Sequence, residues 1–206
     1  WTPATLGVPG IRTVTQCAVA PSSARTFYFV SNNTVYGTLN GGTTWDLLYN
    51  LGSSANQMVV HPWNSEVVYV ATDNGLRRTL DGGENWNTAI SGKVWDVRFH
   101  PTDATVVYAL VHEVNPERCA FYRSNDAGDT FQLFDAGYFT PSDPNAADDH
   151  GGRIGTTPAD PDRVYVALLG KGKASDTGWI GLHRSDDQGS HWTNPNGQDG
   201  GLKQNY

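Results

Sequence analysis

The sequence predicts an all-β protein, a β-propeller of four-stranded antiparallel blades, and three observations support this prediction. One eight-residue element occurs four times, at residues 38–45, 79–86, 124–131 and 185–192. The copies begin 41, 45 and 61 residues apart, a period that belongs to repeat architectures and fits the length of a propeller blade. Runs of β-branched and aromatic residues precede each copy, whereas helical periodicity is almost absent from the chain.

The repeated element is predicted to form a tight turn between two strands. Its third residue is Asp or Asn, which can accept hydrogen bonds from backbone N–H groups further along the turn. Its fifth residue is Gly, which tolerates positive φ, and its last residue is an aromatic that begins the next strand and packs between sheets. The third residues are Asn40, Asp81, Asp126 and Asp187, and the last residues are Trp45, Trp86, Phe131 and Trp192. We assign this set to structure and not to catalysis.

A second element precedes each turn and predicts two more strands per unit. A proline at position 21, 62, 101 or 158 separates two segments, and the segment after it is rich in Val, Tyr and Phe. The segment before it shows period two, as in a half-buried strand. The residues in this pattern are Cys17 and Val19, Met58 and Val60, Val97 and Phe99, and Ile154 and Thr156. Each unit therefore consists of strand A, a turn at proline, strand B, a variable loop, strand C, the repeated turn and strand D.

The repeated element resembles the Asp-box, or bacterial neuraminidase repeat, whose pattern is Ser/Thr-x-Asp-x-Gly-x-Thr-Trp. The departures are small: Asn40 replaces Asp, Phe131 replaces Trp, and Asn85 and His191 replace Thr. The resemblance covers nearly the whole chain and implies a propeller like those of sialidases, xyloglucan-degrading glycoside hydrolases, sortilin-type receptors and a photosystem assembly factor. The chain is most similar to the secreted bacterial glycoside-hydrolase type, which implies an extracellular or periplasmic location.

Residues 1–206 are expected to form one Asp-box propeller segment of a larger ring. Trp1 matches the last residue of the repeated element, so residues 1–10 are predicted to be strand D of a preceding blade. The next blades are predicted at about residues 11–50, 51–91, 92–136 and 137–199, with residues 200–206 starting a further blade. The expected partner is then the rest of a longer propeller, and a terminal strand exchange within a closed ring is the alternative.

Composition narrows the classes of function. The chain has 14 Lys and Arg against 21 Asp and Glu, a net charge of −7, which disfavours nucleic acid as a partner because phosphate binding needs clustered basic charge. No apolar run approaches the ~20 residues of a membrane-spanning helix, so no membrane association is predicted. Cys17 and Cys119 are interpreted as two buried small apolar residues and not as a disulfide.

Candidate ligand-binding residues follow from the loops. In a propeller the B–C loops and D–A connections lie on one face around the channel mouth, where variable loops on a rigid scaffold carry function. Insertions lengthen this face at residues 111–118, 137–152 and 170–179. Each blade has one polar residue at the same position of strand A, and these residues are Gln16, Gln57, Asp96 and Arg153. They are predicted either to form a polar ring at the channel mouth or to hydrogen-bond with polar groups at the sheet edge. The candidate ligand-binding residues are Gln57, Asp96, Arg153, His150 and Trp179.

Glycoside hydrolysis requires two carboxyl groups that flank the scissile bond. Asp73 ends strand B in a Thr-Asp segment similar to the one that bears a catalytic Asp in the xyloglucanase-type family, although Asn74-Gly75-Leu76 departs from that family's Gly-rich continuation. Glu113 and Asp149 are the other candidate catalytic carboxylates, and Asp96 and Asp148 are further possible partners. Sialidase activity is disfavoured because the sequence shows no arginine clamp. The Phe/Tyr-Arg-Ile-Pro segment expected in sialidases has its nearest match at residues 152–155, which lack the aromatic residue and the proline.

The leading functional hypothesis is a secreted, carbohydrate-active propeller that acts on or binds a polymeric glycan. Exposed aromatic side chains can stack on sugar rings, and the candidates are Trp63, Trp95, Tyr138, Phe139 and Trp179. Residues 148–150 are interpreted as a solvated acidic loop, so neither a metal nor a cofactor is predicted. The alternative is a non-catalytic propeller that binds protein or glycan, as sortilin-type receptors do, and the sequence leaves both open.

Overall fold

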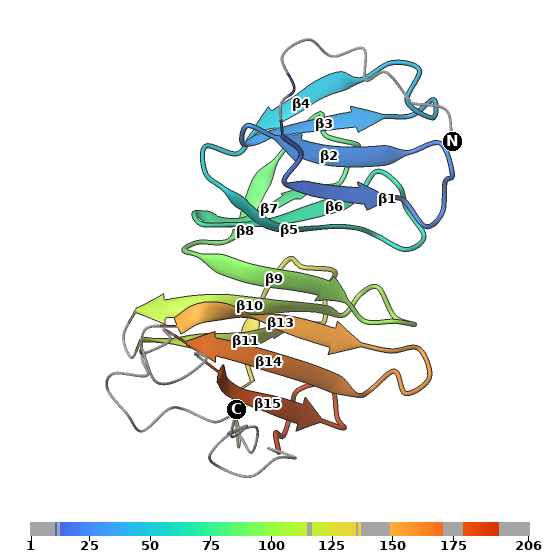
Figure 1. Cartoon of the computed structure of the whole chain (residues 1–206). Coiled ribbons are helices and arrows are strands. Elements are labelled where there is room, and N and C mark those ends of the chain that lie inside the picture. The colour runs from blue at the N-terminus through green and yellow to red at the C-terminus, as the bar shows by residue number, and fades with distance from the viewer. Residues whose placement is uncertain are drawn as a thin grey trace, which may run out of the picture. The chain divides into compact units, whose positions relative to one another are not determined.

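The computed structural model describes residues 11, 13–114, 117–134, 136, 149–170 and 179–193, with the backbone alone at residues 117, 149, 150, 169, 170, 179 and 180. Every regular element in these residues is a strand, and neighbouring strands pair antiparallel. Figure 1 shows these strands gathered into successive sheets. The prediction of an all-β fold is therefore confirmed.

Each sheet is formed by strands that are consecutive in the sequence. The first contains β1 (Gln16–Val19), β2 (Phe27–Ser31), β3 (Thr34–Thr38) and β4 (Asp46–Asn50). The second contains β5 (Ala55–Val60), β6 (Val68–Thr72), β7 (Gly75–Thr79) and β8 (Asn87–Ile90). The third contains β9 (Val94–Phe99), β10 (Val107–Val114), β11 (Glu117–Ser124) and β12 (Gln132–Leu133). The fourth contains β13 (Asp149–Thr156), β14 (Val164–Gly170) and β15 (Trp179–Ser185), with an isolated bridge from Arg184 to Thr193.

The chain divides after Val94 into two compact units. In the first unit, the sheet β1–β4 packs on the sheet β5–β8 through a core that includes Tyr28, Val30 and Val35 on one side and Met58 and Val70 on the other. A hydrogen bond of 2.8 Å from the Tyr28 hydroxyl to the Ser65 carbonyl oxygen joins the two sheets at the edge of this core. Burying each such side chain stabilises the fold by roughly 1.5–3 kcal/mol.

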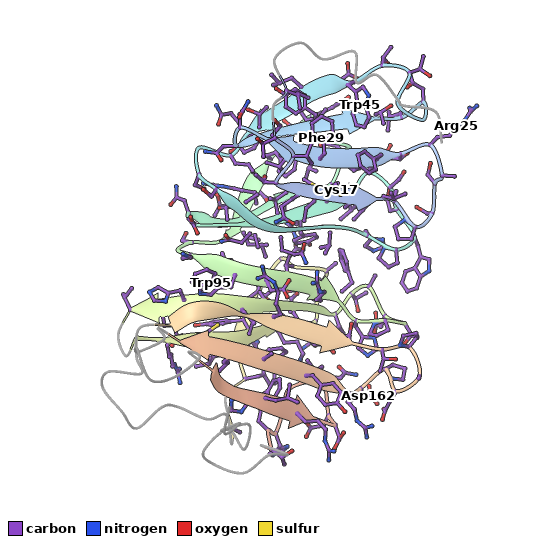
Figure 2. The ribbon with its side chains drawn as sticks, in the orientation of Figure 1. Cys17, Arg25, Phe29, Trp45, Trp95 and Asp162 are labelled. Carbon is purple, nitrogen blue, oxygen red and sulfur yellow. The ribbon has the colours of Figure 1, made fainter. Side chains whose placement is uncertain are left out.

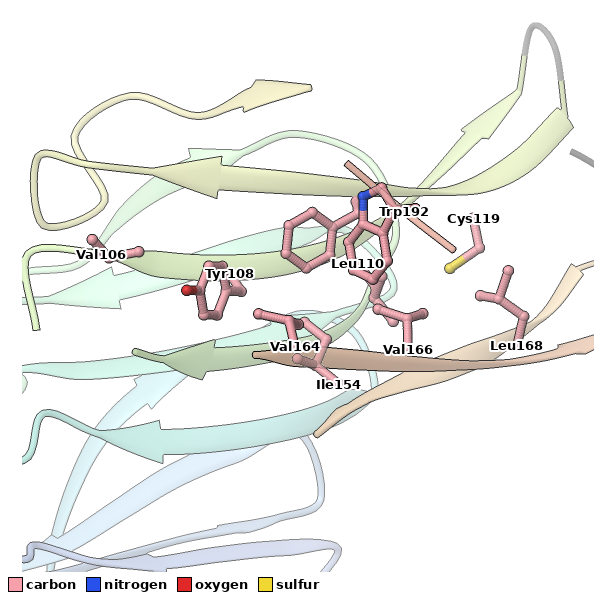
Figure 3. Packing of buried hydrophobic residues seen from close by; sticks show 10 residues of the cluster. Val106, Tyr108, Leu110, Cys119, Ile154, Val164, Val166, Leu168 and Trp192 are labelled. Atoms are coloured by element: carbon pink, nitrogen blue, oxygen red, sulfur yellow. The ribbon is translucent and has the colours of Figure 1, made fainter. Parts of the chain in front are cut away.

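The second unit has an equivalent core between the sheets β9–β12 and β13–β15. Tyr108, Leu110 and Phe121 of the third sheet pack on Val164 and Val166 of the fourth, and Figure 3 shows most of these residues around the Trp192 indole. The ring centroids of Phe121 and Trp192 lie 4.8 Å apart at 71°, and the indole N–H donates to the Phe134 carbonyl oxygen. Period-two alternation in β10, β11 and β14 produces this core.

The structure corrects the interpretation that Cys17 is buried. Ala18 of β1 packs on the core of the first unit, so the alternation of the strand directs Cys17 and Val19 to the opposite face. There Cys17 is exposed and Val19 is 57% exposed (Figure 2). The equivalent residues of β5, Met58 and Val60, are buried because that face of the second sheet meets the first sheet. Cys119 is buried as expected, and both cysteines are free thiols.

The four copies of the repeated element fold into the same turn. The first residue's hydroxyl donates to the third residue's side-chain oxygen over 2.6–2.9 Å and accepts the N–H of the fifth residue over 2.8–3.0 Å. The same side-chain oxygen accepts the N–H of the seventh residue over 2.8–3.0 Å. The fourth residue's N–H donates to a carbonyl oxygen in the preceding turn of the same sheet, that of Arg25, Glu66, Thr105 or Asp162. Figure 2 labels Arg25 and Asp162.

These hydrogen bonds favour the ionised carboxylate. The backbone N–H and side chain of Asn85 hold the pKa of Asp81 at about 2. The Ser124 and Thr130 hydroxyls hold the pKa of Asp126 at about 2. Burial raises the pKa of Asp187, but hydrogen bonds from His191 outweigh burial and bring it to about 2. Each carboxylate therefore acts as an acceptor that closes its turn.

Candidate functional site

The hairpins that join strand B to strand C differ in length between the two units. In the first unit, β2 and β3, like β6 and β7, have five residues each, and their arms are joined by residues 32–33 and 73–74. In the second unit, β10 and β11 have eight residues each, and β14 and β15 have seven. The extra length extends the second unit beyond its core at this end, which we call the hairpin end of each sheet.

Glu113 lies on the extension of β10 and has two hydrogen-bond donors from β11. It is directly opposite Arg118, whose Nε donates to Glu113 Oε2 over 2.6 Å, and the Tyr122 hydroxyl donates to Glu113 Oε1. The side chains of Glu113 and Arg118 are 20% and 16% exposed. Glu113, Arg118 and Tyr122 thus form a partly exposed, oriented carboxylate–guanidinium–phenol cluster, a set of groups suited to hydrogen-bonding sugar hydroxyls.

Asp73 lies in the β6–β7 turn of the first unit and is also paired with a cation. Lys93 Nζ lies 3.2 Å from Asp73 Oδ1, and Asn56 Nδ2 donates to the same oxygen over 3.0 Å. The Asp73 side chain is 42% exposed, so solvent screens this ion pair. Asn56 also donates to the Val94 carbonyl oxygen over 2.9 Å, which fixes the amide that holds Asp73.

Gln16 and Arg153, two of the polar residues that share a register in strand A, each donate a hydrogen bond to strand A of a neighbouring sheet. Gln16 of β1 donates to the Asn56 carbonyl oxygen of β5 over 3.2 Å. Arg153 of β13 donates to the Trp95 carbonyl oxygen of β9 over 3.0 Å. Gln57 accepts the N–H of the next residue over 3.0 Å. The two alternatives for this register, a ring at the channel mouth or the sheet edge, stay predictions.

Asp96 is the most buried member of this group, with no exposed surface. Its Oδ1 accepts the Val97 N–H over 2.9 Å, and its Oδ2 accepts the Ile154 N–H of the neighbouring sheet over 2.8 Å. Burial raises the pKa of Asp96, although Arg98, 3.4 Å away, opposes this change. Both oxygens are engaged inside the protein, so Asp96 joins β9 to β13.

Other predicted site residues lie outside the described side chains. This applies to Asp148, Asp149, His150, Trp179, Tyr138 and Phe139. Trp63 is 60% exposed, but it lies in the β5–β6 turn, at the end of its sheet opposite the hairpin. Trp95 is partly buried against the core of the second unit (Figure 2).

Two negative findings apply to the described ranges alone. No three His, Cys, Asp or Glu side chains there are grouped to hold a metal ion. None of the described elements is a helix long and apolar enough to cross a membrane.

Sequence reasoning missed the partners of the two carboxylates. Arg118 and Tyr122 lie on β11, and residues 113 and 118 are paired across β10 and β11, so this contact follows from the strand register. Asn56 lies in β5 and Lys93 in the connection between β8 and β9, both distant from Asp73 in the sequence, so no local pattern indicates them.

Four successive antiparallel sheets, each with its strands in sequence order, define this chain as a β-propeller protein. The GH74 enzyme of Niastella koreensis superposes with a TM-score of 0.69 at 17% identity, over 96% of this chain and 26% of that enzyme. An ancestral GH74 enzyme superposes with a TM-score of 0.70 at 20% identity, over 97% and 26%. YCF48 from Cyanidioschyzon merolae superposes with a TM-score of 0.59 at 12% identity, over 92% and 57%.

These likenesses show the fold, and the propeller predicted from the repeats is confirmed. The chain spans about a quarter of the length of the two GH74 enzymes. No family model and no curated protein matches the sequence.

Proposed function

We propose that this chain belongs to a secreted, carbohydrate-active propeller of the Asp-box type that binds a polymeric glycan at its hairpin end. The observation that carries the proposal is the superposition of nearly the whole chain on two GH74 enzymes. The lengthened hairpins of the second unit support it, because a rigid blade with extended loops is a common way to build a ligand site.

Within this proposal Glu113 is the first candidate for a catalytic or sugar-binding carboxylate. Its two donors fix its orientation, and it keeps partial exposure on the hairpin extension. Asp149 is its proposed partner, because the backbone of Asp149 is paired with Gly170 at the hairpin end of β14 in the same unit. A hydrolase would place the two carboxyl groups about 5–9.5 Å apart.

The test combines binding and hydrolysis. Electrophoresis of the folded protein through gels containing xyloglucan or another soluble glucan measures binding, and release of reducing ends measures hydrolysis. We expect retardation by at least one glucan, and we expect Glu113→Gln to abolish reducing-end release or weaken retardation. Glu66→Gln, in the β5–β6 turn at the opposite end of its sheet, is the matched control. Unretarded migration in every glucan would reject the proposal.

The contacts of the carboxylates favour one second candidate, a non-catalytic propeller that binds glycan or protein. Asp73 and Glu113 each have a basic partner, and Asp96 is buried with both oxygens engaged. Retardation by a glucan without release of reducing ends, in a preparation whose far-UV circular dichroism shows the β fold, would support this candidate over the hydrolase.

A further inference from the structure

We propose that Asn74 is a site of spontaneous deamidation and that the repeated turn protects Asn40 from the same reaction. Both residues precede glycine, in the steps Asn40-Gly41 and Asn74-Gly75. Glycine has no side chain to shield its backbone nitrogen or restrict its φ, so this nitrogen approaches a neighbouring carbonyl group more easily than in other residues. The two steps are chemically alike, and their surroundings in the fold differ.

The reaction needs only the chain and water. The backbone nitrogen of the glycine loses its proton and attacks Cγ of the asparagine, forming a C–N bond. The side-chain nitrogen takes up a proton and leaves as ammonia, which creates a five-membered succinimide ring. Water then opens the ring at either carbonyl carbon, so that the products are an aspartate or an isoaspartate. The balance is one water consumed and one ammonia released.

Asn40 is held away from this reaction by its turn. Asn40 Oδ1 accepts from the Thr38 hydroxyl over 2.9 Å and from the Thr44 N–H over 3.0 Å, and Nδ2 donates to Thr44 Oγ1 over 2.8 Å. The attacking nitrogen is also engaged, because the Gly41 N–H donates to the Arg25 carbonyl oxygen over 2.8 Å. The side chain must leave its partners, and the Gly41 N–H must leave its acceptor, before the ring can close.

Asn74 has no comparable restraint on its side chain. It is exposed in the β6–β7 turn, and its hydrogen bonds in the described part of the chain come from its backbone. The Asn74 N–H donates to the Thr72 hydroxyl over 3.1 Å, and its carbonyl oxygen accepts from Arg77 over 3.4 Å. The side-chain amide can therefore rotate toward the Gly75 nitrogen without breaking a side-chain hydrogen bond.

The product changes the candidate site of the first unit. Residue 74 follows Asp73, so deamidation places a new negative charge beside the carboxylate that Lys93 and Asn56 hold. An isoaspartate also lengthens the backbone of the tight connection between β6 and β7. The modification thus alters the charge and the shape of the hairpin end together.

The experiment compares both sites in one molecule. The folded chain is incubated at mildly alkaline pH, and peptide mapping by mass spectrometry follows deamidation of the peptides containing residues 40 and 74. Each net hydrogen bond contributes roughly a factor of five to an equilibrium constant, so two or more lost bonds predict at least about a tenfold faster reaction at Asn74. In denaturant the two rates should converge, because both steps are Asn-Gly.

Variants separate the turn from other causes. Thr38→Ala removes the hydroxyl that holds Asn40 and should accelerate deamidation at Asn40 with no change at Asn74, whereas Thr38→Ser should preserve protection. Asp81→Asn creates a second Asn-Gly step inside a repeated turn and should react as slowly as Asn40. Equal rates at the two sites in the folded chain, or a difference that persists in denaturant, would overturn the proposal.

Discussion

Gly83 and Gly82 are adjacent in the second repeated turn, yet a methyl group should affect stability very differently at the two positions. A Cβ on Gly83 would lie 2.8 Å from Leu48 Cδ1, 3.0 Å from its Cβ and 3.1 Å from its Cγ, at a φ of +104°. A Cβ on Gly82 would meet only Glu66 Cγ, at 3.9 Å, at a φ of +71°. Ala127 and Gln188 occupy the position of Gly82 in other copies with φ of 55° and 58°.

The expected magnitudes follow from these two environments. A left-handed backbone costs an alanine ~1–2 kcal/mol, and this is the whole expected cost of Gly82→Ala. Gly83→Ala adds overpacking against Leu48, which costs ~1–3 kcal/mol, because the whole Leu48 side chain and not only its tip is too close. Leu48 packs against the core of the first unit and has little room to move. We expect Gly83→Ala to lose about 2–5 kcal/mol in total.

Urea unfolding followed by near-UV circular dichroism measures the difference, since the stacked Tyr49 and Trp86 rings, 5.1 Å apart, report on the same unit. A double-mutant cycle with Leu48→Ala measures the steric part, because that substitution removes Cδ1 and Cγ, two of the three Leu48 atoms that the new methyl group would meet. Equal unfolding midpoints for Gly82→Ala and Gly83→Ala would refute the proposed packing of the turn on Leu48.

Three further outcomes are expected. Asp96→Ala should lower the stability of the second unit by about 2–4 kcal/mol, because two buried N–H groups lose their acceptor; a urea midpoint equal to that of the unmodified chain would contradict this role. The pKa of Asp126 is about 2 in the folded chain against ~3.9 in the unfolded chain, so its ionised carboxylate stabilises the folded state above about pH 4. This stabilisation disappears as the pH falls toward 2. The difference in melting temperature between the unmodified chain and Asp126→Asn should therefore narrow over that interval, and a constant difference would count against the turn hydrogen bonds. Phe121→Ala should cost ~3–5 kcal/mol by calorimetry, since the ring fills the core against Trp192, and a loss below 1 kcal/mol would place the ring outside that core.

The parts of the fold that the sequence predicts well are those governed by local contacts. The first, third, fifth and seventh residues of each repeated turn hydrogen-bond to one another, so a short sequence pattern includes both partners of each of these hydrogen bonds. Period-two alternation likewise places Met58 and Val60 in the core. Alternation alone does not say which face of a strand is covered, and for that reason the same pattern gave a wrong result for Cys17.

The candidate site depends on contacts between distant segments, and sequence reasoning was weaker there. Asp96 has a polar side chain at a position equivalent to Gln57, but its second acceptor contact is to Ile154, in another sheet. Only the packing of β9 near β13 decides whether such a carboxylate faces solvent or the protein interior. Glu113 was a candidate because of its loop, whereas its pairing with Arg118 follows from the hairpin register.

The two ends of each sheet have different requirements, and this difference explains where function can vary. At the repeated turns, the third and seventh residues differ between copies while the backbone hydrogen bonds stay the same: the Thr44 hydroxyl accepts from Asn40, whereas the Thr130 hydroxyl donates to Asp126. Sequence changes there are limited to pairs that close the same turn. At the hairpin end, arms of five and eight residues occur on sheets with the same strand order. Added residues at that end extend past the core without breaking its contacts. The length and the charge of the hairpins can therefore change there while the repeated turns continue to stabilise the sheet.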